Sequence, residues 1–469
     1  MCGIAGVFNS FRASELVLLE IYSLQHRGQE SVGISSSDGN TVRTVRRGGR
    51  VLEGIKREDI SYLKGHIAIA HVRYSTAGES GEANAQPLFR ETDLGPVAVA
   101  HNGNIVNYEA LRKELENRGI RFEHSSDTEL FLALLSTGNT LLPEGLELHP
   151  RDEYILPRLF YALSRMEGAY SFLMLLRDRL IAGRDPFGFR PLSVGRKGKT
   201  ILLASESCAF HTVEGEFWRE LMPGEVMVLD EAGIRSYFPF KCEHLAQCVF
   251  ELIYFSRPDS LVFGDWVYRV REELGRQLAR EDDVEADVVI PVPDSGLVPA
   301  LGYAKERGLP FELGLIRNHY VGRSFIEPTQ ELRNLRVLMK LSPNRAVVEG
   351  KRVVVVDDSL VRGTTSKKIM AMLRSGGAKE IHMRVASPPV IGPCYFGIDT
   401  PTKEELIANR MSVEEIREFI GVDSLRYLSL EGLKKCVKKH ESFCDACFSN
   451  RYPTLNLSLV KSCEVITPP

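Results

Sequence analysis

The sequence has almost no excess of charge of either sign. Its 59 Lys and Arg residues face 62 Asp and Glu residues, which leaves a formal net charge of −3. Because neutralising phosphates requires a concentrated excess of basic residues, this balance argues against nucleic acid as a partner. The longest basic run, residues 434–440, is expected to be the solvated face of a helix.

Long apolar runs are also lacking. No segment reaches the roughly 18 apolar residues that a membrane helix needs. The N-terminus lacks the basic region and long apolar stretch of a secretory signal. We therefore expect a cytoplasmic protein with no membrane partner.

Cysteine is scarce, with 9 residues in 469, which is too few for a disulfide scaffold. The cysteines are unevenly placed: Cys2 stands alone at the start, while Cys444 and Cys447 form a CxxC near the end. The sequence supports no role for four others, which are expected to be packed thiols. These four are Cys208, Cys242, Cys436 and Cys463.

The remaining composition is that of a folded protein, with 43% apolar and 26% charged residues. The length predicts two large domains or about three smaller ones. In the first half, short apolar runs such as 66–72 and 97–100 are broken by Gly, Asn and Ser, which predicts strands and turns. Helices are expected over 108–117 and 127–135, with Asp127 as an N-cap.

The second half alternates strands with helices. Apolar strands are predicted over 287–292 and 351–358, each followed by a Gly-containing turn and a helix, over 297–307 and 367–375. The near-continuous apolar character of the second strand is typical of a parallel strand covered on both faces. This half is therefore expected to be a parallel α/β sheet. The tail, 403–439, is expected to be largely helical, and the two domains are expected to join near residues 235–250.

Cys2 offers a particular chemistry if Met1 is removed. The thiol and a free α-amino group would then share one carbon. An α-amine has a pKa of about 8, so near neutral pH it can act as the base for its own nucleophile. Taken alone, a cysteine at position 2 could be accidental, but five segments that follow in order give it a context. They are CGIAG at 2–6, QHRGQES at 25–31, HVRYST at 71–76, HNGN at 101–104 and SSDTE at 125–129.

Together these segments resemble the N-terminal-nucleophile glutamine amidotransferase domain. The resemblance implies an αββα fold in which Cys2 is the nucleophile, while Asn102 and the backbone N–H of Gly103 form the oxyanion hole. It also implies that Arg73 binds the glutamine carboxylate, which suits a planar guanidinium, and that Asp127 binds the glutamine ammonium. Without the other segments, a surface salt bridge or a helix cap would be the preferred interpretation of Arg73 or Asp127.

The segment VVVVDDSLVRGTTS at 353–366 is the strongest signal in the second half. An apolar strand delivers Asp357 and Asp358 at its carboxyl end, where open α/β sheets bind ligands. The Gly-Thr-Thr-Ser turn then opens a helix, whose N–H groups and hydroxyls can receive a phosphate. The order of residues is not that of a Walker loop.

This segment resembles the loop of type I phosphoribosyltransferases that binds phosphoribosyl pyrophosphate. The resemblance implies that Asp357 and Asp358 hold the ribose hydroxyls, directly or through Mg²⁺, and that Ser295 in the turn after the previous strand completes the magnesium site. It also implies that one stretch cradles the 5′-phosphate: Arg362, Gly363, Thr364, Thr365 and Ser366. Residues 317–340 resemble a mobile loop that closes over the substrate, although Leu338 and Met339 stand where a basic residue is expected.

A lone CxxC is compatible with a redox pair, half of a zinc site or chance. With Cys248 and Cys394 as distant partners, Cys444 and Cys447 could form a four-thiolate site. Such a site suits either Zn²⁺ or a 4Fe–4S cluster, and the spacing does not decide between them. The four positions resemble the cluster ligands of the iron–sulfur branch of the glutamine phosphoribosylpyrophosphate amidotransferases, which implies a structural 4Fe–4S cluster.

The resemblance covers nearly the whole chain and implies two domains. These are a glutaminase over 2–240 and a type I phosphoribosyltransferase over 248–469 with a helical, cluster-binding tail. The implied activity is amidophosphoribosyltransferase: glutamine hydrolysis, internal passage of ammonia, and formation of 5-phosphoribosylamine and pyrophosphate in purine synthesis. A homotetramer inhibited by purine nucleotides is implied as well. Because only Met1 precedes Cys2, we expect removal of Met1 alone. The alternatives are another synthase that uses the same glutaminase domain, and a nucleotide-sensing regulator without turnover.

Overall fold

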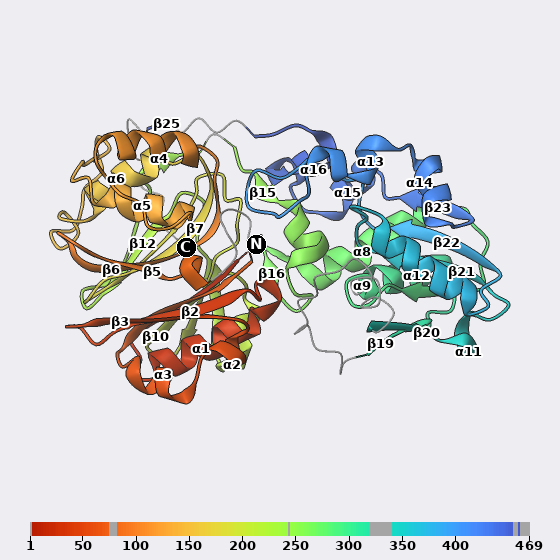
Figure 1. The fold of residues 1–469 in the computed structure, drawn as a ribbon, viewed down its shortest axis with the longest axis horizontal. Coiled ribbons are helices and arrows are strands. Elements are labelled where there is room, and N and C mark those ends of the chain that lie inside the picture. The colour runs from red at the N-terminus through yellow and green to blue at the C-terminus, as the bar shows by residue number, and fades with distance from the viewer. Residues whose placement is uncertain (1, 75–81, 243, 319–339, 454–457, 460–469) are drawn as a thin grey trace.

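Two antiparallel sheets form one half of the molecule, and a parallel sheet with its covering helices forms the other (Figure 1). The computed structural model describes residues 2–74, 82–242, 244–318, 340–453 and 458–459. In Figure 1 the antiparallel half lies at the left, mainly in red to yellow-green, and the parallel half lies at the right, in green to blue.

The antiparallel half is a sandwich whose inner faces bury apolar side chains of both sheets, among them Ile4, Ile69, Ala98 and Leu173. The first sheet contains, in spatial order, β11 (Glu216–Glu220), β9 (Ser193–Lys197), β10 (Thr200–Ala204), β1 (Gly3–Phe8), β4 (Ile67–Arg73), β2 (Ser31–Ser37) and β3 (Val42–Gly48). The second contains β13 (Gly233–Tyr237), β12 (Val226–Asp230), β8 (Leu180–Arg184), β7 (Gly168–Leu175), β6 (Gly95–Ile105) and β5 (Leu88–Thr92).

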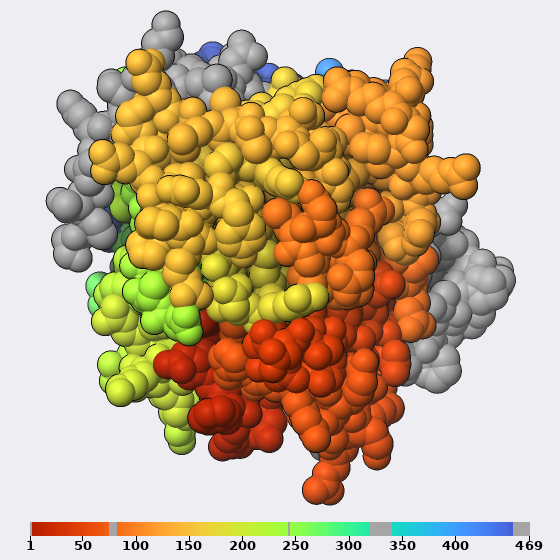
Figure 2. Space-filling view, turned by 90° about the vertical axis from the view of Figure 1, so that its left-hand side faces the viewer, coloured from red at the N-terminus to blue at the C-terminus, as the bar shows by residue number. Residues whose placement is uncertain are grey.

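Helices cover the outer face of each sheet. Apolar side chains such as Val17 and Phe210 pack on the first sheet, and others such as Leu111 and Leu159 pack on the second. Figure 2 shows this half from outside, with red N-terminal segments below and orange and yellow segments above. The predicted αββα fold is confirmed. Its helices are α1 (Ala13–Ser23), α2 (Val51–Gly54), α3 (Arg57–Tyr62), α4 (Tyr108–Asn117), α5 (Asp127–Leu135), α6 (Leu156–Arg165) and α7 (Cys208–Thr212).

The second half is built on four parallel strands, as predicted. The valines of residues 353–356 are fully buried because they point alternately to the two faces: Val354 and Val356 pack towards α8 and α9, while Val353 and Val355 pack towards α12 and α14. The strands, in spatial order, are β18 (Val288–Pro291), β21 (Arg352–Asp357), β22 (Glu380–Val385) and β23 (Ser424–Tyr427). The helices are α8 (Val267–Arg280), α9 (Leu297–Arg307), α12 (Thr364–Ser375) and α14 (Val413–Ile420).

Smaller elements complete the second half. A single π-helical turn, η3 (Glu251–Phe255), stands where the two halves meet, and β15 (Gln247–Cys248) pairs in parallel with β24 (Phe443–Cys444). The others are β14 (Phe240–Lys241), β16 (Leu261–Val262), β17 (Asp265–Trp266), β19 (Leu315–Arg317), β20 (Leu341–Pro343), β25 (Ser458–Leu459), α11 (Arg345–Val348), α13 (Ile407–Arg410), α15 (Leu430–Cys436) and α16 (Ala446–Ser449). Among the described residues, no helix combines the length and the apolar character needed to cross a membrane.

Two local predictions are wrong in detail. The N-cap of α5 is Ser126, whose side chain accepts a hydrogen bond from the N–H of Thr128, so Asp127 is the first helical residue rather than the cap. The tail 403–439 is interrupted by β23, because pairing with the edge of β22 satisfies backbone groups that a helix would otherwise satisfy internally. Helix α15 ends at Cys436, so only the start of the basic run is helical, and Lys438 pairs with Asp265.

Candidate functional site

Strand pairing brings Cys2 to the end of β4. Gly3 at the start of β1 pairs with Val72, the neighbour of Arg73, which is the last residue of β4. Arg73 is only 4% exposed, and Gly28 lies against its backbone: a Cβ at position 28 would stand 2.6 Å from the Arg73 carbonyl carbon. The segments QHRG and HVRY thus meet beside the cysteine.

Cys2 is held through its backbone. Its N–H donates to Oδ1 of Asn102 at 3.4 Å, and its carbonyl accepts from Nε of Arg27 at 3.1 Å. Burial raises the pKa of the Cys2 thiol, which the nearby positive charges of the N-terminus and of Arg73 lower in part. A thiol with a raised pKa requires a base to become a nucleophile.

Asn102 and Gly103 lie side by side on β6. The Asn102 side chain is fully buried, and its Nδ2 has no hydrogen-bond partner within the described part of the chain. Burying a hydrogen-bond donor without an acceptor costs free energy. The Asn102 amide is therefore well suited to donate a hydrogen bond to an oxygen of a ligand. At Gly103 φ is +155°, and a Cβ would stand 1.9 Å from the Ala169 carbonyl oxygen, so only glycine fits.

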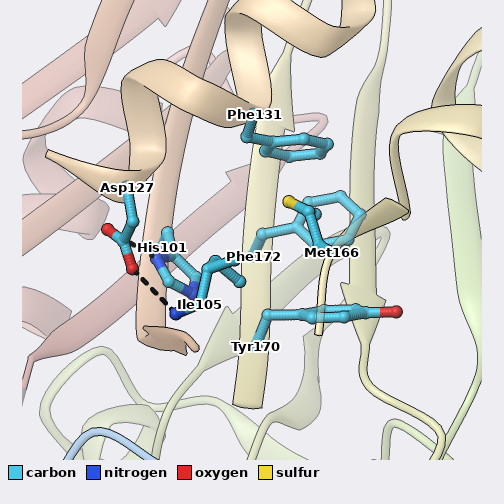
Figure 3. Close-up of a pocket in the computed structure, with 7 residues that line it drawn as sticks. All are labelled: His101, Ile105, Asp127, Phe131, Met166, Tyr170 and Phe172. Carbon is cyan, nitrogen blue, oxygen red and sulfur yellow. Dashed lines mark hydrogen bonds and ion pairs between the residues drawn. The ribbon is translucent and has the colours of Figure 1, made fainter. Parts of the chain in front are cut away.

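Asp127 reaches the same strand from the first turn of α5 (Figure 3). Its Oδ2 accepts from the N–H of Ile105 at 3.2 Å, and its Oδ1 lies 3.5 Å from Nδ1 of His101. Burial alone would raise the pKa of Asp127, but the charge and hydrogen bond of His101 lower it below its usual value. The carboxylate is therefore available as an anion beside Cys2, above a cavity of about 10 Å³ that also borders Phe131 and Tyr170.

His101 was given no role by the sequence, although it belongs to the HNGN segment. Its ring orients Asp127, and its carbonyl oxygen accepts a hydrogen bond from Nε2 of His71 at 3.2 Å. Burial lowers the pKa of His71 to about 3, so that ring is neutral at physiological pH.

A buried ion-pair network is a second feature that sequence analysis missed. Arg27 pairs with Glu206 at 2.5 Å and with Glu251 at 2.7 Å, and Glu251 also lies 3.4 Å from Arg190. All four side chains are fully buried, and Glu251 comes from η3, on the side of the second half. Removing one partner of such a network leaves an uncompensated buried charge, which typically costs about 3–5 kcal/mol.

The two predicted phosphoribosyl segments also meet. Strands β18 and β21 are parallel neighbours, with Pro291 paired to Val356, so the turn that holds Ser295 lies at the same edge as Asp357 and Asp358. Gly296 packs onto the end of β21, because a Cβ there would stand 2.3 Å from the Val356 carbonyl oxygen.

The adjacent carboxylates of Asp357 and Asp358 repel each other. The pKa of Asp357 is raised well above its ordinary value, mainly by burial and then by the charge of Asp358. The side chains of Ser295, Asp357 and Asp358 offer oxygen atoms, which Mg²⁺ prefers as ligands, and a cation would reduce the repulsion between the two carboxylates. The residues therefore fit a magnesium ion.

The start of α12 contains most of the residues that were predicted to cradle the phosphate. Gly363 has φ of +75° and precedes Thr364, Thr365 and Ser366, which form the first turn of the helix. Helix α12 begins three residues earlier than predicted, so these residues present the N–H groups that a helix leaves without internal partners. Arg362 is exposed and bonds to Glu405 at 3.3 Å.

The predicted mobile loop lies largely outside the described residues, as do Leu338 and Met339. Its first described part, Arg317 at the end of β19, pairs with Asp294 in the turn beside Ser295. Met1 and Cys463 also lie outside the described residues.

The four predicted cluster cysteines come together between the halves. Cys248 and Cys444 are paired residues of β15 and β24. Cys394 and Cys447 join them. Burial raises the pKa of the Cys248 thiol to about 11, and the charge of Cys394 adds to the increase. Burial also raises the pKa of the Cys447 thiol well above its usual value, with added contributions from Cys248, Cys394 and Cys444. Cys208 is buried in the first half, and Cys436 donates to the Gly432 carbonyl, which agrees with their prediction as packed thiols.

No three Cys, His, Asp or Glu side chains in the described ranges are arranged around a point that could hold one metal ion. Four thiolates are a donor set that fits either Zn²⁺ or a 4Fe–4S cluster.

Comparison with protein families identifies two parts of the chain. The family model of the glutamine amidotransferase domain matches residues 71–212, and that of the phosphoribosyl transferase domain matches residues 267–387. Each match contains predicted site residues of the corresponding half.

Curated relatives match along nearly the whole chain. Amidophosphoribosyltransferase 1, chloroplastic, of Arabidopsis thaliana is 50% identical over 455 residues, which cover 96% of this chain and 78% of the relative. Amidophosphoribosyltransferase of Bacillus subtilis is 46% identical over 460 residues, or 97% and 94%. A solved structure of glutamine phosphoribosylpyrophosphate amidotransferase from B. subtilis, complexed with ADP and GMP, superposes with a TM-score of 0.87 at 44% identity, covering 98% of this chain and 99% of that one.

Proposed function

The chain belongs to the amidophosphoribosyltransferase family, and we propose that Cys2 and Asp357 mark its two active sites. The enzyme uses glutamine as the nitrogen source for the amination of phosphoribosyl pyrophosphate, in purine biosynthesis. The products are 5-phosphoribosylamine, glutamate and pyrophosphate. We take the two domains to be residues 2–240 and 248–469.

In the glutaminase site, the Cys2 sulfur attacks the side-chain amide carbon of glutamine. After removal of Met1, the α-amino nitrogen of Cys2 accepts the thiol proton and returns it to the departing ammonia. The oxyanion is stabilised by Nδ2 of Asn102 and the N–H of Gly103, while Arg73 binds the carboxylate and Asp127 the ammonium of glutamine. The observation that carries this assignment is the side chain of Asn102. Its Oδ1 accepts a hydrogen bond from the Cys2 backbone N–H, and its buried Nδ2 has no partner within the described residues.

In the transferase site, Asp357, Asp358 and Ser295 hold Mg²⁺ and the ribose, and the 5′-phosphate lies on the N-terminal turn of α12 between Arg362 and Ser366. Bound Mg²⁺ supplies positive charge that helps pyrophosphate leave. Ammonia released at Cys2 passes internally to C1 of the ribose, since in bulk water it would be protonated and lose its nucleophilic electron pair. The Arg27–Glu251 ion pair joins the two halves beside Cys2, so the halves that hold the two proposed sites are in contact there.

Several further properties follow from the family. We propose a homotetramer that purine nucleotides inhibit, supported by the similar structure that binds ADP and GMP. We propose the cytoplasm as the compartment, because thiolate ligands persist in a reducing environment.

Cys248, Cys394, Cys444 and Cys447 are proposed to bind a 4Fe–4S cluster with a structural role. Protein purified without oxygen is expected to contain four irons and four sulfides per chain and a broad visible absorbance. Cys447→Ser should lose the absorbance and most of the iron, whereas Cys436→Ser, a change at a thiol outside the set, should keep both. Stoichiometric zinc in place of iron would contradict the proposal.

The assay that tests the function measures pyrophosphate release from phosphoribosyl pyrophosphate and Mg²⁺, with glutamine or ammonia as nitrogen source. Both sources should give pyrophosphate, and glutamine should also give one glutamate per pyrophosphate. Glutamate formation without phosphoribosyl pyrophosphate consumption would indicate a different synthase. Ligand binding without turnover from either source would indicate a regulator.

A further inference from the structure

The segment of residues 394–397, which carries Cys394, lies directly behind the proposed oxyanion strand. Nδ2 of Asn104 donates to the carbonyl oxygen of Tyr395 at 2.9 Å. A Cβ on Gly397 would stand 2.9 Å from the carbonyl carbon of Gly103 and 3.0 Å from its oxygen. Two backbones are therefore in contact, with no side chain between them.

Phe189 and Arg190 of the first half contact the other side of this segment. Phe396 is buried and stacks on Phe189, with ring centroids 4.3 Å apart. Nε of Arg190 donates to the Phe396 carbonyl oxygen at 2.9 Å. Because Arg190 is itself fully buried, its guanidinium has a fixed position from which to hold the segment.

Arg190 is also connected to Cys2, through Glu251 and Arg27. Glu251 lies 3.4 Å from Arg190 and 2.7 Å from Arg27, and Nε of Arg27 donates to the carbonyl of Cys2 at 3.1 Å. One buried carboxylate thus fixes two arginines, of which one orients the nucleophile and the other holds the support of Gly103.

We propose that the 394–397 segment is a positioning element that sets the oxyanion strand relative to Cys2, so that this segment governs glutamine hydrolysis but not ammonia transfer. This inference rests on the proposed roles of Cys2 and Gly103. Oxyanion donors act on the charge that develops in the transition state, and a site that is about 1 Å too loose loses much of that effect. A displaced Gly103 lowers kcat for glutamine and leaves KM unchanged, because ground-state binding depends on Arg73 and Asp127.

The test is Gly397→Ala, with Gly421→Ala as its matched control. Both glycines have positive φ, +98° and +76°, so both substitutions carry backbone strain. A Cβ at Gly421 meets nothing within 4 Å, whereas the one at Gly397 pushes on Gly103. We expect Gly397→Ala to lower kcat for glutamine about 10- to 100-fold, with KM and ammonia-dependent activity within about twofold of wild type. Gly421→Ala should match wild type in all three.

A second readout separates strand displacement from damage to the nucleophile. Iodoacetamide alkylates the Cys2 thiolate by forming a C–S bond as iodide leaves, and this step builds no oxyanion. The rate of alkylation at Cys2, followed by peptide mass spectrometry, should be the same in wild type and Gly397→Ala, although the variant turns over glutamine slowly. Unchanged kcat in Gly397→Ala would overturn the inference, as would loss of ammonia-dependent activity or slowed alkylation.

Asn104→Ala provides the test if Gly397→Ala does not fold. It removes only the hydrogen bond to Tyr395, and we expect a kcat decrease of about 3- to 10-fold at constant KM, equivalent to the net loss of one hydrogen bond. Wild-type kcat in Asn104→Ala would then overturn the inference. Failure of the proposed function itself is distinguishable, because wild-type enzyme would then hydrolyse no glutamine.

Discussion

Replacing Cys2 by alanine is expected to abolish glutamine-dependent pyrophosphate formation and leave ammonia-dependent formation intact. Without the sulfur no thioester can form, and the remaining oxyanion donors act on an amide that only water can attack. Loss of a nucleophile typically reduces the rate by about 10⁴-fold or more. Ammonia supplied from solution needs none of the glutaminase groups, since the transferase residues lie in the other half, in the turn after β18 and from the end of β21 to the first turn of α12.

The control for Cys2→Ala is Cys436→Ala, which removes a half-buried thiol from α15 and should leave both activities unchanged. Intact mass should show wild-type enzyme without Met1. Active enzyme that retains Met1 would contradict the α-amine as the base, and glutamine-dependent activity in Cys2→Ala would contradict the nucleophile.

Neutralising Asp358 or Asp357 to asparagine is expected to lower both glutamine- and ammonia-dependent pyrophosphate formation strongly. The two carboxylates are adjacent at the end of β21, where the Asp358 N–H donates to Oδ1 of Asp357 at 3.0 Å. A bound metal supplies several kcal/mol of charge stabilisation, and about 1.4 kcal/mol corresponds to a factor of ten. We therefore expect a loss of about 10²- to 10³-fold, with a higher Mg²⁺ concentration needed for half-maximal activity.

Asp287→Asn is the matched control for the Asp357 and Asp358 variants. It neutralises a carboxylate at the start of β18, at the opposite end of the same sheet, where Asp287 pairs with Arg352. Both activities and their Mg²⁺ dependence should remain as in wild type. Normal ammonia-dependent turnover in Asp358→Asn would show that the ribose and metal bind elsewhere.

The sequence determined the elements whose signals are local. The helices Tyr108–Asn117 and Leu297–Arg307 have the predicted bounds, because apolar periodicity and turn residues act within a few positions. The valine run 353–356 predicted a doubly covered parallel strand for the same reason. The site segments were also recognisable, since each is contiguous.

Predictions from local sequence were wrong where a contact with residues distant in the sequence was more favourable. Asp127 is a good helix cap by propensity, yet Ser126 takes that position while the Asp127 carboxylate turns to His101 and Ile105. Residues 424–427 became a strand because the edge of β22 was available to pair with them. In both cases a tertiary contact outweighed a propensity of about 1 kcal/mol or less.

The sequence by itself determined the family and predicted the residues of each site, because both depend on short contiguous segments. Only the tertiary structure decided how the two sites are joined. Glu251 meets Arg27 across 224 positions of sequence, and the 394–397 segment meets Gly103 across about 290. Such contacts depend on which strands pair and which charges must be compensated when buried, and these requirements exist only once the chain has folded.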